Sequence, residues 1–266
     1  MEGIHGKECD KDSFQLIFNQ LIMATQARIN VFPKAHFWLL IPFVLTIAGF
    51  YLSYWSKFTD APWRQHMHGI SATAWYILVV MQPWLIHNKP VIFHKRLGII
   101  GVFLSGAVVF SALQVMPHQV VNEFLPDVLK YGFSFADLCA LAGFSICVIA
   151  GVWKAKYINV HARWLISTVF WILLPATARL VYFPLLNIYE GNPPITYLQT
   201  VYLCFIITVL LPLLYLLWLD YKKEKKVYTP YLFTLIGITF YTLAIAPMGN
   251  WQWWIDICHN VIGRGL

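Results

Sequence analysis

Seven long apolar stretches constrain the fold of this 266-residue chain more than any other feature. A helix needs about 20 predominantly apolar residues to cross the hydrocarbon core of a bilayer. The composition agrees, because 59% of the residues are hydrophobic and only 12% are charged, whereas soluble domains have roughly a quarter charged. We therefore predict an all-α, polytopic membrane bundle of seven transmembrane helices, near 37–55, 67–87, 95–116, 132–153, 162–183, 196–219 and 230–247.

The distribution of lysine and arginine predicts the orientation of this bundle. Fourteen of these residues precede the first span or lie in connections on the same side of the membrane, and four lie on the opposite side. Cytoplasmic loops carry an excess of Lys and Arg, so we expect a cytoplasmic N-terminus. The expected parts are a cytoplasmic segment with an interfacial helix (1–36), a transmembrane bundle (37–247) with its core in spans two to five (66–183), and an outer tail (248–266).

Several classes of function lack support in the sequence. The formal net charge of +7 is what basic loops beside anionic lipid headgroups produce, so it gives no reason to expect nucleic-acid binding. The five cysteines show no CxxC spacing and no regular pairing, so no disulfide framework is predicted. The sequence also lacks the HExxH, GxSxG and P-loop motifs of zinc proteases, serine hydrolases and nucleotide-driven enzymes. The lipid bilayer is therefore the first expected partner.

Ionisable and amide side chains inside the predicted spans fall into two layers. Such groups are costly in a bilayer, and where they occur they commonly mark a functional site. The inner layer holds Gln82, His87, His94 and His161, and the outer layer holds His68, Gln114, His118, Asp137 and Arg179. Asp137 and Arg179 lie at similar depth on consecutive spans. A structural ion pair between them is the simplest prediction, and a substrate-facing Arg179 is the alternative.

His94 and His161 are the best candidates for a cofactor site. They share the inner layer on spans three and five, and neutral imidazole is suited to axial ligation of haem iron between helices. We therefore predict that both ligate the iron of a b-type haem, with His68 as a further candidate and His118 as its weaker outer partner. One face of span three carries small side chains, typical either of close helix packing or of a flat groove for a macrocycle: Gly98, Gly101, Ser105, Val108 and Ala112.

Each of these histidines also has a simpler explanation, in which it caps a helix or contacts lipid headgroups beside a neighbouring Lys or Arg. That explanation suffices for His36, His66, His87 and His259. A non-haem iron site of the membrane hydroxylase kind needs clustered histidines. Only His66 and His68 are close in sequence, and residues two apart point to different faces of a helix.

Short motifs in the chain resemble those of a bacterial family of multi-pass membrane proteins with no assigned function. They are His68-Gly-Ile-Ser-Ala-Thr-Ala-Trp75, Gln82-Pro83, His94-Lys-Arg-Leu-Gly98 and His161-Ala-Arg-Trp164, with Arg179-Leu180 downstream. The family pattern has HRxLG at one helix start and HRRWM at another, and this chain departs from it at Ala162 and Leu165. The resemblance covers residues 66–182 and implies a protein of the bacterial cytoplasmic membrane.

The placement of the histidines is also distantly similar to that in di-haem cytochromes b and haem A synthases. That likeness implies electron transfer with a quinone or another redox partner. Span four carries Asp137 and no histidine, so the second haem of those proteins has no complete ligand set in this chain. Two rival functions stay open: a non-catalytic assembly or interaction protein with structural histidines, and a small-molecule transporter, for which the sequence shows no inverted halves.

Overall fold

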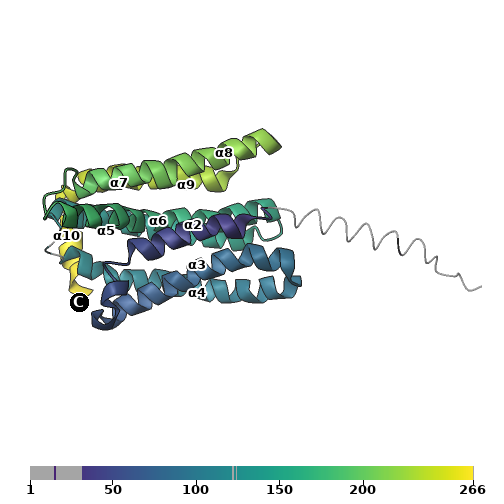
Figure 1. The fold of residues 1–266 in the computed structure, drawn as a ribbon, viewed down its shortest axis with the longest axis horizontal. Coiled ribbons are helices and arrows are strands. Elements are labelled where there is room, and N and C mark those ends of the chain that lie inside the picture. Colours follow the sequence, from purple (N-terminus) through teal and green to yellow (C-terminus); the bar gives the residue numbers. More distant parts are fainter. Residues whose placement is uncertain (1–14, 16–31, 122, 124, 266) are drawn as a thin grey trace, which may run out of the picture.

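The chain forms a bundle of long helices (Figure 1). The structure is a computed structural model, and it describes residues 15, 32–121, 123 and 125–265. All regular structure in these ranges is helical, with no strand. The interfacial helix expected within residues 1–36 falls almost wholly outside them. The all-α prediction is confirmed for the described part of the chain.

Six helices are long and apolar enough to cross a membrane. They are α3 (Trp63–Asn88), α4 (Val91–Val120), α5 (Asp127–Trp153), α6 (Ile158–Ile188), the continuous helix Tyr197–Glu224 and α9 (Thr229–Gly249). Each predicted span from the second to the seventh coincides with one of them, and the helices extend a few residues beyond the predicted bounds. The protein is therefore an integral membrane protein with a multi-pass helical bundle.

The first predicted span is shorter than expected. Helix α2 runs only from Ala35 to Gly49, and the chain then turns into the 3₁₀ segment η1 (Trp55–Asp60). At 1.5 Å per residue, 15 residues extend over roughly 22 Å, less than the ~30 Å hydrocarbon core. The count of seven spans is thus not confirmed. Helix α2 packs against α3 and α6 and closes one side of the bundle.

The helix Tyr197–Glu224 changes its winding near its middle. It consists of α7 (Tyr197–Phe205), the π segment η2 (Ile206–Leu210) and α8 (Leu211–Glu224). Pro212 is the second residue after the π segment, and a proline supplies no N–H to the carbonyl one turn earlier. The ladder of hydrogen bonds therefore widens at this point, while the helix continues.

Two ends of the bundle are used as reference points below. The His94 end is where α3 ends and where α4 and α6 begin, and the His68 end is where α3 begins and where α4 and α6 end. Helices α3 and α4 lie along one edge of the bundle and α7, α8 and α9 along the opposite edge, with α2, α5 and α6 between them (Figure 1). That the His94 end faces the cytoplasm stays a prediction from the charge distribution.

The core is centred on large aromatic side chains of α3, α5 and α6. Trp75 packs edge-to-face on Phe144, with ring centroids 5.0 Å apart, and its indole Nε1 donates a hydrogen bond to Thr168 Oγ1 at 3.2 Å. Trp171 lies between Gly143 and Gly237, where an added Cβ would approach its ring to 2.3 and 2.5 Å. Only glycine leaves room for the indole at these two positions.

Pro117 lies within a helix and does not end it. It lies inside α4, which continues to Val120. A proline within a membrane helix is tolerated where neighbouring elements satisfy the freed backbone groups. His118 therefore belongs to the last turn of α4 and not to a loop.

The C-terminal tail packs on the His68 end through α10 (Gln252–Ile257) and the π segment η3 (Cys258–Ile262). Trp254 is buried, and its Nε1 donates to the backbone oxygen of Tyr131 at 2.8 Å. Trp251 and Trp253 are exposed, which fits the aromatic anchor expected at a membrane interface.

Candidate functional site

His94 and His161 are neighbours at the His94 end. They project from the first turns of α4 and α6, and their rings meet edge-to-face with centroids 6.3 Å apart and planes at 75°. The inner layer of the sequence analysis thus brings two histidines from distant parts of the chain together. Gln82 lies beside them, because its Nε2 donates to the backbone oxygen of His94 at 3.4 Å.

The two imidazoles are held differently. Nδ1 of His161 lies 2.7 Å from the backbone oxygen of Gly151. Since a carbonyl oxygen can only accept a hydrogen bond, this nitrogen carries the ring proton and Nε2 keeps its lone pair. Nδ1 of His94 is buried and has no hydrogen-bond partner among the described residues. The His161 ring is therefore held by a hydrogen bond, whereas Nδ1 of the His94 ring is left without one.

The small-residue face of α4 is used for helix packing. A Cβ at Gly101 would lie 3.0 Å from Leu78 of α3, and one at Gly98 would lie 3.7 Å from Gln82. Ser105 and Val108 on the same face are buried. Gly98 and Gly101 therefore pack against α3, as close helix packing predicts, while Val108 and Ala112 of the same face line the cavity described below.

The sequence His161-Ala-Arg-Trp164 also contains a buried ion pair that sequence reasoning missed. The side chain of Arg163 is 2% exposed and that of Asp220 is 7% exposed. The guanidinium donates two hydrogen bonds to this carboxylate, from Nε to Oδ2 at 2.8 Å and from Nη2 to Oδ1 at 2.5 Å. Arg163 was counted only as a loop charge, although Asp220 ends a neighbouring span at the same end of the bundle.

Further groups complete this ion pair. Nη1 of Arg163 donates to the backbone oxygen of Asn159 at 2.9 Å, and Nη2 reaches Glu224 at 3.1 Å. The ring of Tyr228 covers the guanidinium at 3.7 Å, and its hydroxyl donates to Glu224. Burial, together with this hydrogen bond, raises the pKa of the Tyr228 hydroxyl above its ordinary value. The cluster ties α6 to α8 and to the start of α9.

Most of the outer polar layer converges on a cavity of about 490 Å³ at the His68 end. Residues of α2 to α7 and of α9 line it, and His68, His118, Asp137 and Arg179 are among them. Gln114 is not part of the lining, while Gln65 and Gln119 are. Aromatic and aliphatic side chains form the rest of the wall. A mainly apolar cavity with a few convergent polar groups is the usual form of a small-molecule site.

His68 is positioned in this cavity by two serines. Its Nδ1 lies 3.3 Å from Ser111 Oγ, which is 2.9 Å from Ser71 Oγ. The Ser111 hydroxyl donates its single proton to the backbone oxygen of Val108 at 3.0 Å. With this proton donated to Val108, Ser111 accepts from His68, an assignment that puts the ring proton on Nδ1 and the lone pair on Nε2.

Asp137 and Arg179 face the same cavity without touching. The described residues show no ion pair between them, so the predicted direct pair is not formed. Nη1 of Arg179 instead donates to the backbone oxygen of Pro175 at 2.9 Å, one turn earlier on α6, and its guanidinium lies 5.0 Å from the ring centroid of Phe50. Gln119 approaches Asp137, but its amide nitrogen has no hydrogen-bond partner.

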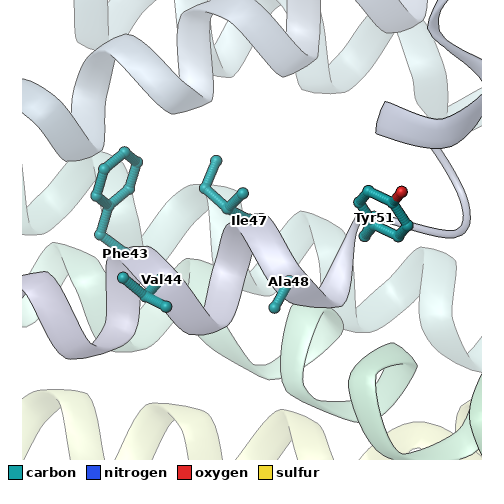
Figure 2. A pocket seen from close by; sticks show the side chains of 5 residues that line it. All are labelled: Phe43, Val44, Ile47, Ala48 and Tyr51. Atoms are coloured by element: carbon teal, nitrogen blue, oxygen red, sulfur yellow. The ribbon is translucent and has the colours of Figure 1, made fainter.

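A second hollow lies on the surface of α2 and has a different character. Figure 2 shows Phe43, Val44, Ile47, Ala48 and Tyr51 around it, all on this helix or just after it. Val44 and Tyr51 are largely exposed on the face that a lipid bilayer would cover. With the hydroxyl of Tyr51 as its only polar side-chain group, this hollow offers contact to acyl chains and no chemistry.

Comparison with known proteins gives no match: no family model, no curated protein and no solved structure is similar to this chain. The resemblance seen in the short motifs therefore stays a prediction. Among the described residues, no group of three or more His, Cys, Asp or Glu side chains is arranged to hold a metal ion.

Proposed function

We propose that this protein is a membrane redox protein in which His94 and His161 ligate the iron of a b-type haem. The observation that carries this proposal is the 6.3 Å separation of the two ring centroids across α4 and α6. Bonds from imidazole to a metal are about 2.0–2.1 Å long, so two imidazoles on opposite sides of one metal have centroids roughly 6 Å apart. The separation of the two ring centroids fits that requirement.

The number of ligands favours haem over a simple metal ion. Zinc and non-haem iron take three or four protein ligands, and only two are present here. Haem brings four nitrogens of its own, so two axial histidines complete its coordination. The hydrogen bond from His161 Nδ1 to Gly151 is the support that a ligating histidine normally has, since it leaves Nε2 free.

A planar group between the two histidines requires that α4 and α6 are not packed directly on each other. Helix α4 packs on α3 and α5, and α6 packs on α2, α5 and α9, so α4 and α6 are not close-packed neighbours. Lys95 and Arg96 are exposed directly after His94 and supply positive charge for two propionates. A bound haem would supply one-electron chemistry, for which a quinone or another redox partner in the membrane is required.

A visible spectrum tests this proposal. Protein purified after expression with ample haem should show a Soret band, and dithionite should produce the sharp bands of a six-coordinate b-type haem. His94→Ala and His161→Ala should each lose these bands, because one axial ligand does not fix six-coordination. The matched control is His87→Ala, a histidine at the same end of the bundle.

The rival function makes the opposite prediction. If the protein is a non-catalytic assembly or interaction partner, the purified wild type shows no Soret band. His94→Ala and His161→Ala then change stability alone, through the contact with Gly151 and the packing of the two rings. Absence of haem from the wild type would overturn the redox proposal.

A further inference from the structure

We propose that the cavity at the His68 end binds a small zwitterion, whose carboxylate or phosphate group pairs with Arg179 and whose ammonium group pairs with Asp137. This inference rests on residues of the outer layer only. It is independent of the haem proposal, which concerns the opposite end of the bundle. Two observations carry it. The first is that two opposite charges line one cavity without pairing, and the second is the size and aromatic lining of that cavity.

Arg179 has unused capacity for an anion. A guanidinium carries five N–H donors in a planar fork, and the described contacts of Arg179 use one of them, toward Pro175. No carboxylate among the described residues pairs with it. A positive charge inside a membrane span without a counter-ion is costly. An anionic group of a ligand would satisfy the free part of the fork, in the bidentate manner that arginine favours.

Asp137 presents the complementary charge. It lines the cavity from α5, and no ion pair to it is present among the described residues. Gln119, the nearest polar neighbour on α4, leaves its amide nitrogen buried and unpartnered. An anion alone would be repelled by Asp137, and a cation alone would be repelled by Arg179. A ligand that carries both charges can pair with Asp137 and Arg179 at the same time.

The remaining walls fit a compact body with apolar parts. The volume of about 490 Å³ lies within the range of roughly 300–1,000 Å³ that small-molecule pockets occupy. Phe50, Tyr76, Phe133, Trp171 and Tyr197 contribute aromatic rings. Such rings pack against apolar groups and also attract an ammonium group over their faces.

His68 adds a hydrogen-bond acceptor to the site. In the tautomer whose Nδ1 proton points to Ser111, the lone pair on Nε2 is available to an N–H or O–H group of the ligand. A neutral imidazole accepts such a bond without adding charge. The cavity thus offers the Arg179 guanidinium to an anion, the Asp137 carboxylate to a cation, and a hydrogen-bond acceptor on His68, between apolar walls.

Two sources supply this shared chemistry: a free amino acid with a large side chain, and the headgroup of a phosphatidylethanolamine lipid. The first probe is L-tryptophan, compared with indole-3-propionate, which lacks the ammonium group, and with tryptamine, which lacks the carboxylate. The second probe is phosphatidylethanolamine, compared with phosphatidylglycerol of equal chain length. Calorimetry measures the first series on purified protein, and native mass spectrometry measures retained lipid in the second.

In one of the two series, the wild type should bind the zwitterion at least tenfold more tightly than the analogue that lacks a charge. Arg179→Gln and Asp137→Asn should each weaken the zwitterion at least tenfold. In the amino-acid series, Arg179→Gln should not weaken tryptamine binding, and Asp137→Asn should not weaken indole-3-propionate binding, because each variant removes the charge that repels that analogue. The matched controls are Lys130→Gln and Asp127→Asn, which remove a surface ion pair at the same end of the bundle.

The analogue series uses the wild type alone, so it stays decisive even where a variant fails to fold. Equal affinity for a zwitterion and its singly charged analogue in both series would overturn the proposal. Binding of neither zwitterion would overturn it as well, and would mean that water alone bridges the two charges. Losses in Arg179→Gln and Asp137→Asn no larger than in the controls would remove the assigned roles.

Discussion

Asp220→Asn should lower the free energy of unfolding by about 3–5 kcal/mol, one of the two largest effects expected in this chain. The substitution keeps the shape of the side chain and removes its charge. It leaves the guanidinium of Arg163, 2% exposed, with a neutral amide where two charge-assisted hydrogen bonds were made. The cost arises because the buried guanidinium loses its buried counter-ion and keeps only Glu224, whose side chain is 37% exposed. Thermal or denaturant unfolding of the detergent-solubilised protein measures it.

Glu224→Gln is the matched control for this variant. Glu224 also contacts Arg163, but its side chain is 37% exposed, and exposed pairs contribute only about 0–1 kcal/mol. The double variant Arg163→Met/Asp220→Leu should recover much of the loss, since it removes both charges from the buried site. An equal loss in Asp220→Asn and Glu224→Gln would contradict the central role of the buried pair.

The spans could be predicted from the sequence because their length and apolar content are local properties. The length of the first span could not be predicted, because it depends on contacts between helices. Helix α2 ends at Gly49, where the backbone of Ala176 lies so close that a Cβ would be 2.1 Å from its oxygen. The chain then turns and places Tyr54 over Gly69 of α3. The hydropathy of residues 37–55 does not indicate either contact.

Depth in the membrane could also be predicted, because it follows from the 1.5 Å rise per residue. This is why His94 and His161 were correctly placed at one level, and why His68, Asp137 and Arg179 share a cavity. The direction of a side chain around its helix axis was less accessible. Asp137 and Arg179 lie on the wall of one cavity without contact, since the helices that carry them leave space between the two charges.

The ion pair of Arg163 and Asp220 shows a different gap in the sequence reasoning. Both residues lie where a span meets a basic loop; Arg163 was counted among the basic loop residues, and Asp220 was given no role. A usable signal exists: an arginine in the first turns of one span and an aspartate in the last turns of another lie on the same side of the membrane. Only the packing of α6 near α8 shows that the two are also buried together.

Gly132→Ala and Gly249→Ala should destabilise the bundle by more than the ~1–3 kcal/mol typical of an overpacked core position. The two glycines form a reciprocal contact between α5 and α9. A Cβ at Gly132 would lie 2.2 Å from the backbone oxygen of Ile245, and one at Gly249 would lie 1.9 Å from that of Val128. Each obstacle is backbone, so a rotamer change cannot relieve it and the helices must separate.

Gly106→Ala is the control that isolates this contact. Gly106 lies within α4, and a Cβ there would meet nothing within 4 Å. Alanine is the better helix former by about 0.5–1 kcal/mol, so this variant should be neutral or slightly stabilising. The same unfolding measurement applies to all three variants. Small residues let membrane helices approach closely, because lipid supplies little hydrophobic drive between them. If Gly132→Ala matched Gly106→Ala, the close approach of α5 and α9 would not be what holds this side of the bundle together.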